Sequence, residues 1–332
     1  MKNTISFNLL LIIVLSSFSN AVSKTQLANP FIGKWGIEIE GGGVGWLHVN
    51  EEKGFLDAEL LWIGGSVLPV SNVYLADEKT LVVTRTTVSR KSDERSHTLT
   101  HTLRIEKAGD SLKGTVTGPG RNGEYTTRFT GSKMPPMPEK PDLSKITYGK
   151  PIPLFNGKNL TGWELINPNQ KNGFMAKDGI LVNDPKQPEN GERVSYGNIR
   201  TQQEFEDFNL KLEVNVPEGS NSGVYLRGLY EIQVVDSYGK SVDSHNMGAL
   251  YSRITPTVAA EKPAGEWQSM DITLVDRHVT VILNGKKIID NEPAWGPTGG
   301  AISADVLAPG PVFLQGDHGE VSYRNIVLTP VE

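Results

Sequence analysis

The chain has 332 residues, of which 37% are hydrophobic and 21% are charged, a composition typical of folded globular proteins rather than disordered ones. The formal net charge is −5 and no basic stripe runs through the sequence, so a nucleic acid is not expected as a partner. There are no cysteines, which excludes disulfides, zinc–thiolate sites and cysteine nucleophiles.

Glycine and proline indicate the expected architecture. The chain holds 35 glycines and 20 prolines, which is too many helix breakers for a helix bundle. We therefore expect many short strands joined by tight turns. Since the length itself suggests about two domains, an all-β protein of two domains is predicted.

Residues 1–23 predict a signal peptide. A short basic start precedes an apolar run over residues 5–18, and Ala21 and Ser23 stand at positions −3 and −1 of a cut before Lys24. The alternative is a membrane anchor, but the run is shorter than the ~20 residues that a span needs. A lipid anchor would need a cysteine after the cut. We expect the mature protein to be periplasmic or secreted, with no membrane attachment.

Residues 29–132 predict a small β-barrel or sandwich. Alternation is clear at Leu56, Ala58 and Leu60, which share one face of a strand. The start at Gly33-Lys34-Trp35 is similar to that of lipocalin-type barrels, so a lipocalin-like barrel is expected. Eight short strands at this spacing are typical of such folds. They cover residues 34–40, 44–50, 54–63, 67–74, 80–86, 97–106, 112–116 and 124–130.

Two histidines are the only candidate functional residues of this first domain. His97 and His101 lie four positions apart in one predicted strand, so they share a face. They are either polar residues on a solvated strand or a pair that binds a metal.

A proline-rich segment separates the two domains. Residues 133–141 read KMPPMPEKP, and four prolines in nine positions favour an extended connector. We place a linker at residues 133–145 and a second domain at residues 146–332.

The second domain predicts a two-sheet antiparallel sandwich. Asn284-Gly285 between two β-branched runs is a strong hairpin signal. Helix is scarce, with single turns expected over 202–206 and 258–261. The main predicted strands are residues 208–216, 223–228, 230–235, 268–275, 280–283 and 321–328.

Polar residues gather on two of these strands. If the apolar faces pair, alternation puts Tyr225 and Arg227 of one strand beside Glu231 and Gln233 of the next, all on one polar face. Such a face, with amides and an aromatic ring, could bind a sugar. The alternative is a solvated outer face with an Arg227–Glu231 salt bridge.

The C-terminal hairpin adds further candidates. In residues 310–321, Phe313 and Gln315 alternate with inward-facing apolar residues and should point outward. His318 lies in the turn, where a pKa near neutrality would suit proton transfer. A solvated turn histidine without a role is the alternative.

Seven segments of the second domain together resemble the 3-keto-disaccharide hydrolase family, long catalogued as a domain of unknown function. They span nearly the whole domain in the expected order. The family's Leu-Gln-Asp-His-Gly carries an inserted Gly316 here, which shifts His318 relative to Gln315. The segments are PLFNGKNLTGW (153–163), NSGVYLR (221–227), YEIQVVDSYG (230–239), GALY (248–251), GEWQ (265–268), QGDHG (315–319) and YRNI (323–326).

The resemblance implies a concanavalin-like jelly roll and a glycoside already oxidised to a ketone at C3. The ketone acidifies the C2 proton, so a base can remove it and the C1 substituent can leave. Water then adds back, or the unsaturated sugar is released. The route needs a base, a group that stabilises the enolate, and an acid for the leaving oxygen.

Residue type suggests which side chains act as base, acid and enolate stabiliser. The expected catalytic residues are Glu231 and His318 as base or acid, Arg227 as enolate stabiliser, and Asp236 as an orienting group. The expected substrate-binding residues are Tyr225, Gln233, Tyr251 and Gln315. A divalent cation could polarise the ketone, with Glu231, Asp236 and His318 as plausible ligands, although no compact metal motif is present.

Two other functions stay open. Ordinary glycoside hydrolysis needs a pair of carboxylates, and the Glu-x-Asp-x-x-Glu pattern of concanavalin-like glucanases is absent from the sequence. A lectin-like protein that binds carbohydrate without catalysis is the alternative from another class, because fold does not fix function. The first domain could be an accessory sugar-binding barrel, a dimer surface or a wall of the cleft.

Overall fold

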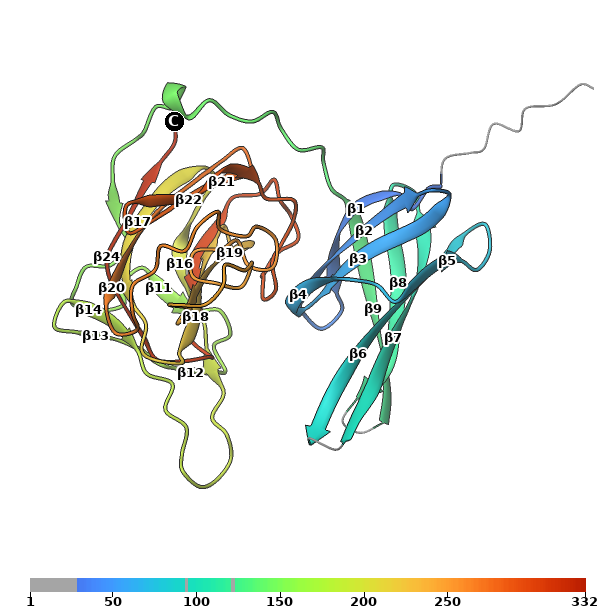
Figure 1. Ribbon diagram of the computed structural model, residues 1–332, viewed down its shortest axis with the longest axis horizontal. Helices are drawn as coiled ribbons and strands as arrows, with labels where there is room; N and C mark the ends of the chain where they lie inside the picture. The colour runs from blue at the N-terminus through green and yellow to red at the C-terminus, as the bar shows by residue number, and fades with distance from the viewer. Residues whose placement is uncertain (1–28, 93–94, 121–122) are drawn as a thin grey trace, which may run out of the picture. The chain divides into compact units, whose positions relative to one another are not determined.

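The computed structural model describes residues 29–92, 95–120 and 123–332 (Figure 1). The predicted signal peptide lies outside these residues. Within them, no helix is long and apolar enough to cross a membrane. Residues Phe31–Glu332 form a single unit, in which two all-β regions follow one another along the chain.

The N-terminal region is an antiparallel sheet of nine strands, ordered β4-β3-β2-β1-β9-β8-β7-β6-β5. The segment predicted as one strand over 67–74 divides into two, because β4 pairs with β3 whereas β5 pairs with β6. The strands are β1 (Gly33–Ile39), β2 (Val44–Glu52), β3 (Phe55–Trp62), β4 (Gly64–Pro69), β5 (Asn72–Leu75), β6 (Thr80–Ser92), β7 (Arg95–Ala108), β8 (Ser111–Gly120) and β9 (Gly123–Lys133).

The division of that strand closes the sheet into a barrel. The Val70 amide donates to the Ala58 carbonyl at 3.0 Å, and the next residue, Ser71, donates to the Thr84 carbonyl at 2.8 Å. The chain thus crosses from one end of the sheet to the other. Alternate residues point inward and fill the barrel, including Trp35, which is fully buried.

The proline-rich segment, residues 133–141 and called the strap below, leads to a short 3-10 helix, η1 (Leu143–Lys145). Two side chains of the second domain bind its backbone. Arg277 donates to the Pro136 carbonyl, and Asn291 Nδ2 donates to the Pro141 carbonyl at 2.8 Å. The strap is therefore held along its length rather than hanging free.

The second domain is a jelly-roll sandwich of two antiparallel sheets, as predicted. The larger sheet has the order β13-β14-β24-β17-β20-β21-β22 with β10 beside β24, and the smaller one has the order β11-β16-β23-β18-β19. The strands are β10 (Ile152–Pro153), β11 (Trp163–Leu165), β12 (Lys171–Asn172), β13 (Phe174–Lys177), β14 (Ile180–Asn183), β15 (Tyr196–Gly197), β16 (Ile199–Phe205), β17 (Phe208–Asn215), β18 (Asn221–Leu226), β19 (Tyr230–Val235), β20 (Trp267–Val275), β21 (His278–Leu283), β22 (Lys286–Pro293), β23 (Gly310–Leu314) and β24 (Val321–Pro330).

Local sequence predicted some connections correctly and others wrongly. Asn284 and Gly285 have φ angles of 50° and 80° and join β21 to β22, which confirms the hairpin. The predicted helical turns are wrong. Residues 202–206 lie almost wholly in β16, where pairing with β11 and β23 overrides local propensity, and residues 258–261 are irregular.

Candidate active site

A row of side chains crosses the outer face of the smaller sheet. Backbone register pairs Glu164 with Arg200, Arg200 with Phe313, Phe313 with Tyr225, and Tyr225 with Glu231. Because cross-strand partners point to the same side of a sheet, these five side chains line one face. The rings of Tyr225 and Phe313 stack with centroids 3.7 Å apart.

The predicted alternation is confirmed for Tyr225, Glu231 and Gln233, but the exposure is not what a solvated outer sheet would have. Val224 and Ile232 pack into the core between the sheets. On the opposite face, Tyr225, Glu231 and Gln233 are only 1%, 4% and 3% exposed. The alternative of a solvated face is wrong, because loops cover these three residues.

One covering loop is residues 295–302. The Thr298 hydroxyl oxygen accepts from the Glu231 amide at 2.9 Å, and the Tyr225 hydroxyl donates to the Gly299 carbonyl at 2.6 Å. A second cover, residues 246–251, runs along β19, where the Tyr251 amide donates to the Glu231 carbonyl at 3.0 Å. These bonds fix both the backbone and the surroundings of Glu231.

Space for the Glu231 carboxyl group comes from a glycine on the neighbouring strand. A Cβ atom at Gly223 would lie 2.5 Å from Glu231 Oε1, so only glycine leaves room there. Burial raises the pKa of Glu231 to about 8, against the smaller lowering effects of the Tyr225 hydroxyl and the His318 charge. Asp317 raises it further. Such a carboxyl group can give or take a proton near neutral pH.

His318 is the second titratable group near Glu231. Its Nδ1 lies 2.8 Å from Asp317 Oδ1, and both side chains are about half exposed, at 47% and 42%. The Asp317 hydrogen bond raises the pKa of His318, with a further rise from the Glu231 charge, whereas burial and Arg193 lower it. The pair is therefore partly open to solvent, and its charges act on the buried carboxyl group.

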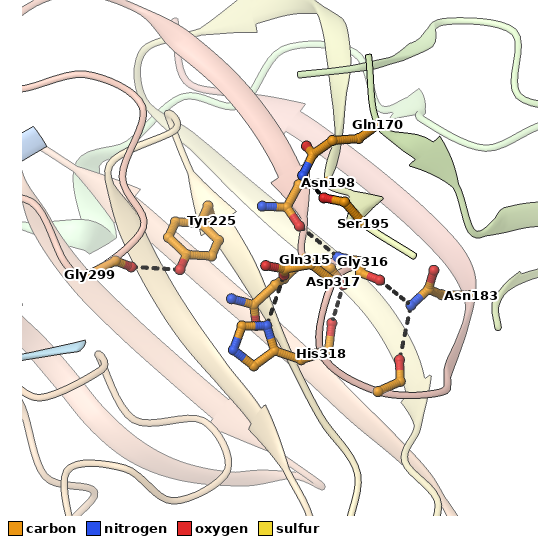
Figure 2. A network of polar contacts seen from close by, with 12 residues as sticks. Gln170, Asn183, Ser195, Asn198, Tyr225, Gly299, Gln315, Gly316, Asp317 and His318 are labelled. Carbon is orange, nitrogen blue, oxygen red and sulfur yellow. Dashed lines mark hydrogen bonds and ion pairs between the residues drawn. The ribbon is translucent and has the colours of Figure 1, made fainter. Parts of the chain in front are cut away.

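The turn that carries His318 is built by two buried or half-buried amides that sequence reasoning missed. Figure 2 shows Asn183 and Asn198 reaching the turn from either side. Asn183 Nδ2 donates to the Gly316 carbonyl at 3.1 Å and to the Gly319 carbonyl at 2.9 Å, and the Gly316 amide donates to Asn198 Oδ1 at 2.8 Å. The inserted glycine is thus an anchored part of the turn.

Truncation of Asn183 tests this anchor. The Asn183→Ala change leaves one buried and one half-buried carbonyl group without their donor, so we expect a loss of about 1–3 kcal/mol in the free energy of unfolding. Activity should fall as well, since the turn would move. Urea unfolding and steady-state kinetics check both, with exposed Asn169→Ala as the control. Equal stability of the two variants would contradict the anchor.

Three predicted substrate-binding residues lie around this cluster. Gln315 is half-buried at the end of β23, and its amide donates to the Gly223 carbonyl at 3.0 Å. Gln233 is buried, and its Oε1 accepts from the Val234 amide at 3.1 Å. Tyr251 is half-buried and meets the His245 ring edge-on at 5.0 Å. Gln315 and Tyr251 are thus the more accessible donors.

Two predicted catalytic residues are not brought to the cluster. Arg227 lies in the β18–β19 turn at φ 55°, where the strand alternation ends, and its guanidinium donates to the carbonyls of Val306 (3.0 Å) and Ala308. Asp236 Oδ2 accepts from the Gly219 amide at 3.0 Å. The Arg227–Glu231 salt bridge is not formed among the described residues, and the orienting role of Asp236 stays a prediction.

The predicted metal ligand set is not formed either. Among the described residues, no three carboxylate or histidine side chains gather in a group that could hold a metal ion. Glu231, Asp236 and His318 therefore do not constitute one ligand set. His97 and His101 likewise belong to no such group in this part of the chain.

The β3–β4 turn and strand β4 of the first domain contact the covering loop 295–302 and His245, the residue just before the cover at 246–251. The Gly300 amide donates to the Ile63 carbonyl at 3.0 Å, and Ser66 Oγ lies 2.8 Å from His245 Nε2. Ile63 has a φ of 64°, an uncommon conformation for a β-branched residue. The first domain thus supports the loops that cover Glu231.

The pKa of Glu231 makes a prediction about stability. The pKa of Glu231 is about 8 in the folded protein and 4.5 as the usual value. The stability that protonated Glu231 contributes is therefore complete below pH 4.5 and is lost as pH rises through about 8. The free energy of unfolding changes by ~1.4 kcal/mol for each pKa unit of the shift. Urea unfolding from about pH 5 to 8 should show wild type losing stability relative to Glu231→Gln. A constant difference across that range would contradict the raised pKa.

Comparison with known proteins identifies a family. The model of the 3-keto-alpha-glucoside-1,2-lyase-like domain family matches residues 150–329, more than half of the chain. No curated protein matches. Among solved structures, a candidate glycosyl hydrolase from Parabacteroides distasonis ATCC 8503 is 28% identical, with 59% of this chain and 92% of that chain covered and a TM-score of 0.44.

Two further solved structures are similar in part. Another candidate glycosyl hydrolase from Parabacteroides distasonis ATCC 8503 is 28% identical, with 54% of this chain and 98% of that chain covered and a TM-score of 0.41. A β-1,3-1,4-glucanase from a mouse hindgut metagenome is 11% identical, with coverages of 55% and 98% and a TM-score of 0.31. Because these TM-scores lie below 0.5, they add nothing about the function of this chain.

Proposed function

Because the chain belongs to the 3-keto-alpha-glucoside-1,2-lyase-like family, we propose that it cleaves 3-keto-glycosides, including 3-keto-disaccharides, by removal of the C2 proton and loss of the C1 substituent. The observation that carries this proposal is the buried Glu231 carboxyl group with its pKa raised to about 8. A base of that pKa is matched to a carbon acid next to a ketone far better than an ordinary carboxylate.

The proposed first step is proton removal by ionised Glu231. The C2–H electron pair forms the C2=C3 bond of an enolate, and the ketone oxygen takes the negative charge. Near pH 7 about one tenth of Glu231 is ionised if its pKa is about 8. The His318 charge acts against protonation of Glu231, and so supports the ionised form.

The second step is loss of the C1 oxygen. The enolate electrons re-form the ketone and make the C1=C2 bond as the C1–O bond breaks, and the departing oxygen takes a proton. We assign this proton to the His318 imidazolium, because the Asp317 hydrogen bond raises its pKa. Addition of water across C1=C2, with hydroxyl at C1 and hydrogen at C2, would complete hydrolysis.

Arg227 is not part of this scheme, since its guanidinium donates to the carbonyls of Val306 and Ala308. Enolate stabilisation instead falls to donors that remain half-exposed beside Glu231, for which Gln315 and Tyr251 are the candidates. We also propose export by residues 1–23, on the strength of their basic start, apolar run and small residues before the cut.

Turnover of an oxidised sugar tests the function. Purified protein is incubated with 3-keto-trehalose or a 3-keto-glucoside, and release of free sugar is followed with and without Mn²⁺, Co²⁺ or Ca²⁺. We expect turnover of the 3-keto compounds and none of unoxidised trehalose. Binding of a 3-keto-glycoside without any turnover would contradict the enzyme and leave the lectin-like alternative.

A further inference from the structure

A small hollow lies among the strands of the N-terminal barrel, within the first domain. It has a volume of about 230 Å³. Apolar side chains of the barrel core form its floor, and polar side chains of β6 and β7 form its rim. Its lining includes Trp62, Arg85, Thr87, His101, Leu103 and Val116.

The rim is a cross-strand row that the backbone register places on the inner face of the barrel. Arg85 of β6 pairs with His101 of β7, and Gly118 of β8 pairs with Tyr125 of β9. A Cβ atom at Gly118 would lie 2.3 Å from His101 Cδ2, so the glycine makes room for the imidazole. The His101 ring lies next to the Tyr125 ring, with their centroids 5.9 Å apart.

The rim carries positive charge that the described residues do not neutralise. Arg85 Nε is buried and has no hydrogen-bond partner within the described part of the chain. Burial lowers the pKa of Arg85, and burial together with the Arg85 charge lowers that of His101. No carboxylate among the described residues forms an ion pair with either side chain. A half-buried cation without a counter-charge is costly unless something pairs with it.

We propose that this hollow binds the carboxylate group of a small acidic ligand, with Arg85 as the anion-binding residue. A guanidinium matches a carboxylate with two parallel hydrogen bonds. The Thr87 hydroxyl and a ring nitrogen of His101 can donate further bonds, and Trp62 offers an apolar wall. The volume suits one acidic sugar ring or a short aliphatic acid. This site is distinct from the Glu231 cluster and gives the first domain a binding role of its own.

Calorimetry on the full-length protein tests the site with D-glucuronate, hexanoate and D-glucose as probes. We expect the two carboxylates to bind and glucose not to bind. Tighter glucuronate would identify an acidic sugar, and tighter hexanoate an aliphatic acid. The proposal would be overturned if neither glucuronate nor hexanoate bound, or if glucose bound as tightly as glucuronate.

Charge removal gives the matched comparison. Arg85→Gln should weaken carboxylate binding at least tenfold, whereas Arg104→Gln, which changes an exposed arginine on β7, should leave it unchanged. Equal binding by both variants would refute the role of Arg85. Should Arg85→Gln unfold, the His101 imidazole resonances of wild-type protein give the answer, because they must shift on adding glucuronate. Cleavage of a 3-keto-glucoside should be unaffected in Arg85→Gln, which separates this site from the proposed function.

Discussion

Glu231→Gln should lower kcat/KM for a 3-keto-glucoside by about 10²–10⁴-fold, the usual contribution of a general base, while the fold survives. The glutamine has nearly the same shape and keeps the position above Gly223, but it cannot take a proton. Steady-state kinetics measure the loss, and circular dichroism with thermal unfolding checks the fold.

The control for this prediction is another carboxylate in the same domain. Glu266 is exposed and lies in the turn before β20, so Glu266→Gln should retain wild-type kinetics. If Glu231→Gln also kept wild-type activity, Glu231 would be removed from the mechanism.

Gly223→Ala is the second large effect. The new methyl group would be 2.5 Å from Glu231 Oε1, so the carboxyl group must move out of its buried position. Overpacking of this kind costs about 1–3 kcal/mol, so we expect the free energy of unfolding to fall by a comparable amount. We also expect the variant to lose most of its activity. Urea unfolding and the 3-keto-glucoside assay measure the two losses.

A double-mutant cycle isolates the cause of that loss. In a Glu231→Ala background the methyl group at position 223 has no carboxyl group to displace, so adding Gly223→Ala should cost much less stability than it does in the wild type. The same cost in both backgrounds would show that the glycine is needed for another reason.

Alternation predicted the faces of β18 and β19 correctly because both strands are regular. Tyr225, Glu231 and Gln233 lie on one face, with Val224 and Ile232 in the core behind them. The period of two holds only while the backbone stays extended. It does not reach Arg227, whose φ of 55° places it in a turn, so its side chain leaves the face to which alternation assigned it and donates to the Val306 and Ala308 carbonyls.

Burial of this face was not predictable from the strands. The covers at 246–251 and 295–302 are irregular segments without periodicity, and their contacts with Tyr225 and Glu231 are long-range hydrogen bonds. Without burial, the pKa of Glu231 would have remained ordinary. The glycine at 223 was part of a recognised motif, but its purpose becomes visible only with the carboxyl group beside it.

In the barrel, too, the strands could be predicted from local sequence, whereas their pairing could not. Eight strands were expected, and the segment over 67–74 was counted as one of them. Its division into β4 and β5 comes from pairing with β3 and β6, strands that the sequence does not show to be neighbours. The cross-strand row of Arg85, His101 and Tyr125 depends equally on that closed register.

The proposed removal of the C2 proton is tested most directly by following the C2 hydrogen of the substrate. A 3-keto-glucoside carrying deuterium at C2 is compared with the unlabelled compound, and the product of the unlabelled reaction in D₂O is examined for deuterium at C2. Removal of the C2 proton, the step assigned to Glu231, predicts slower turnover of the labelled substrate and solvent deuterium at C2 of the hydrated product. Equal rates together with retention of the original hydrogen at C2 would contradict it.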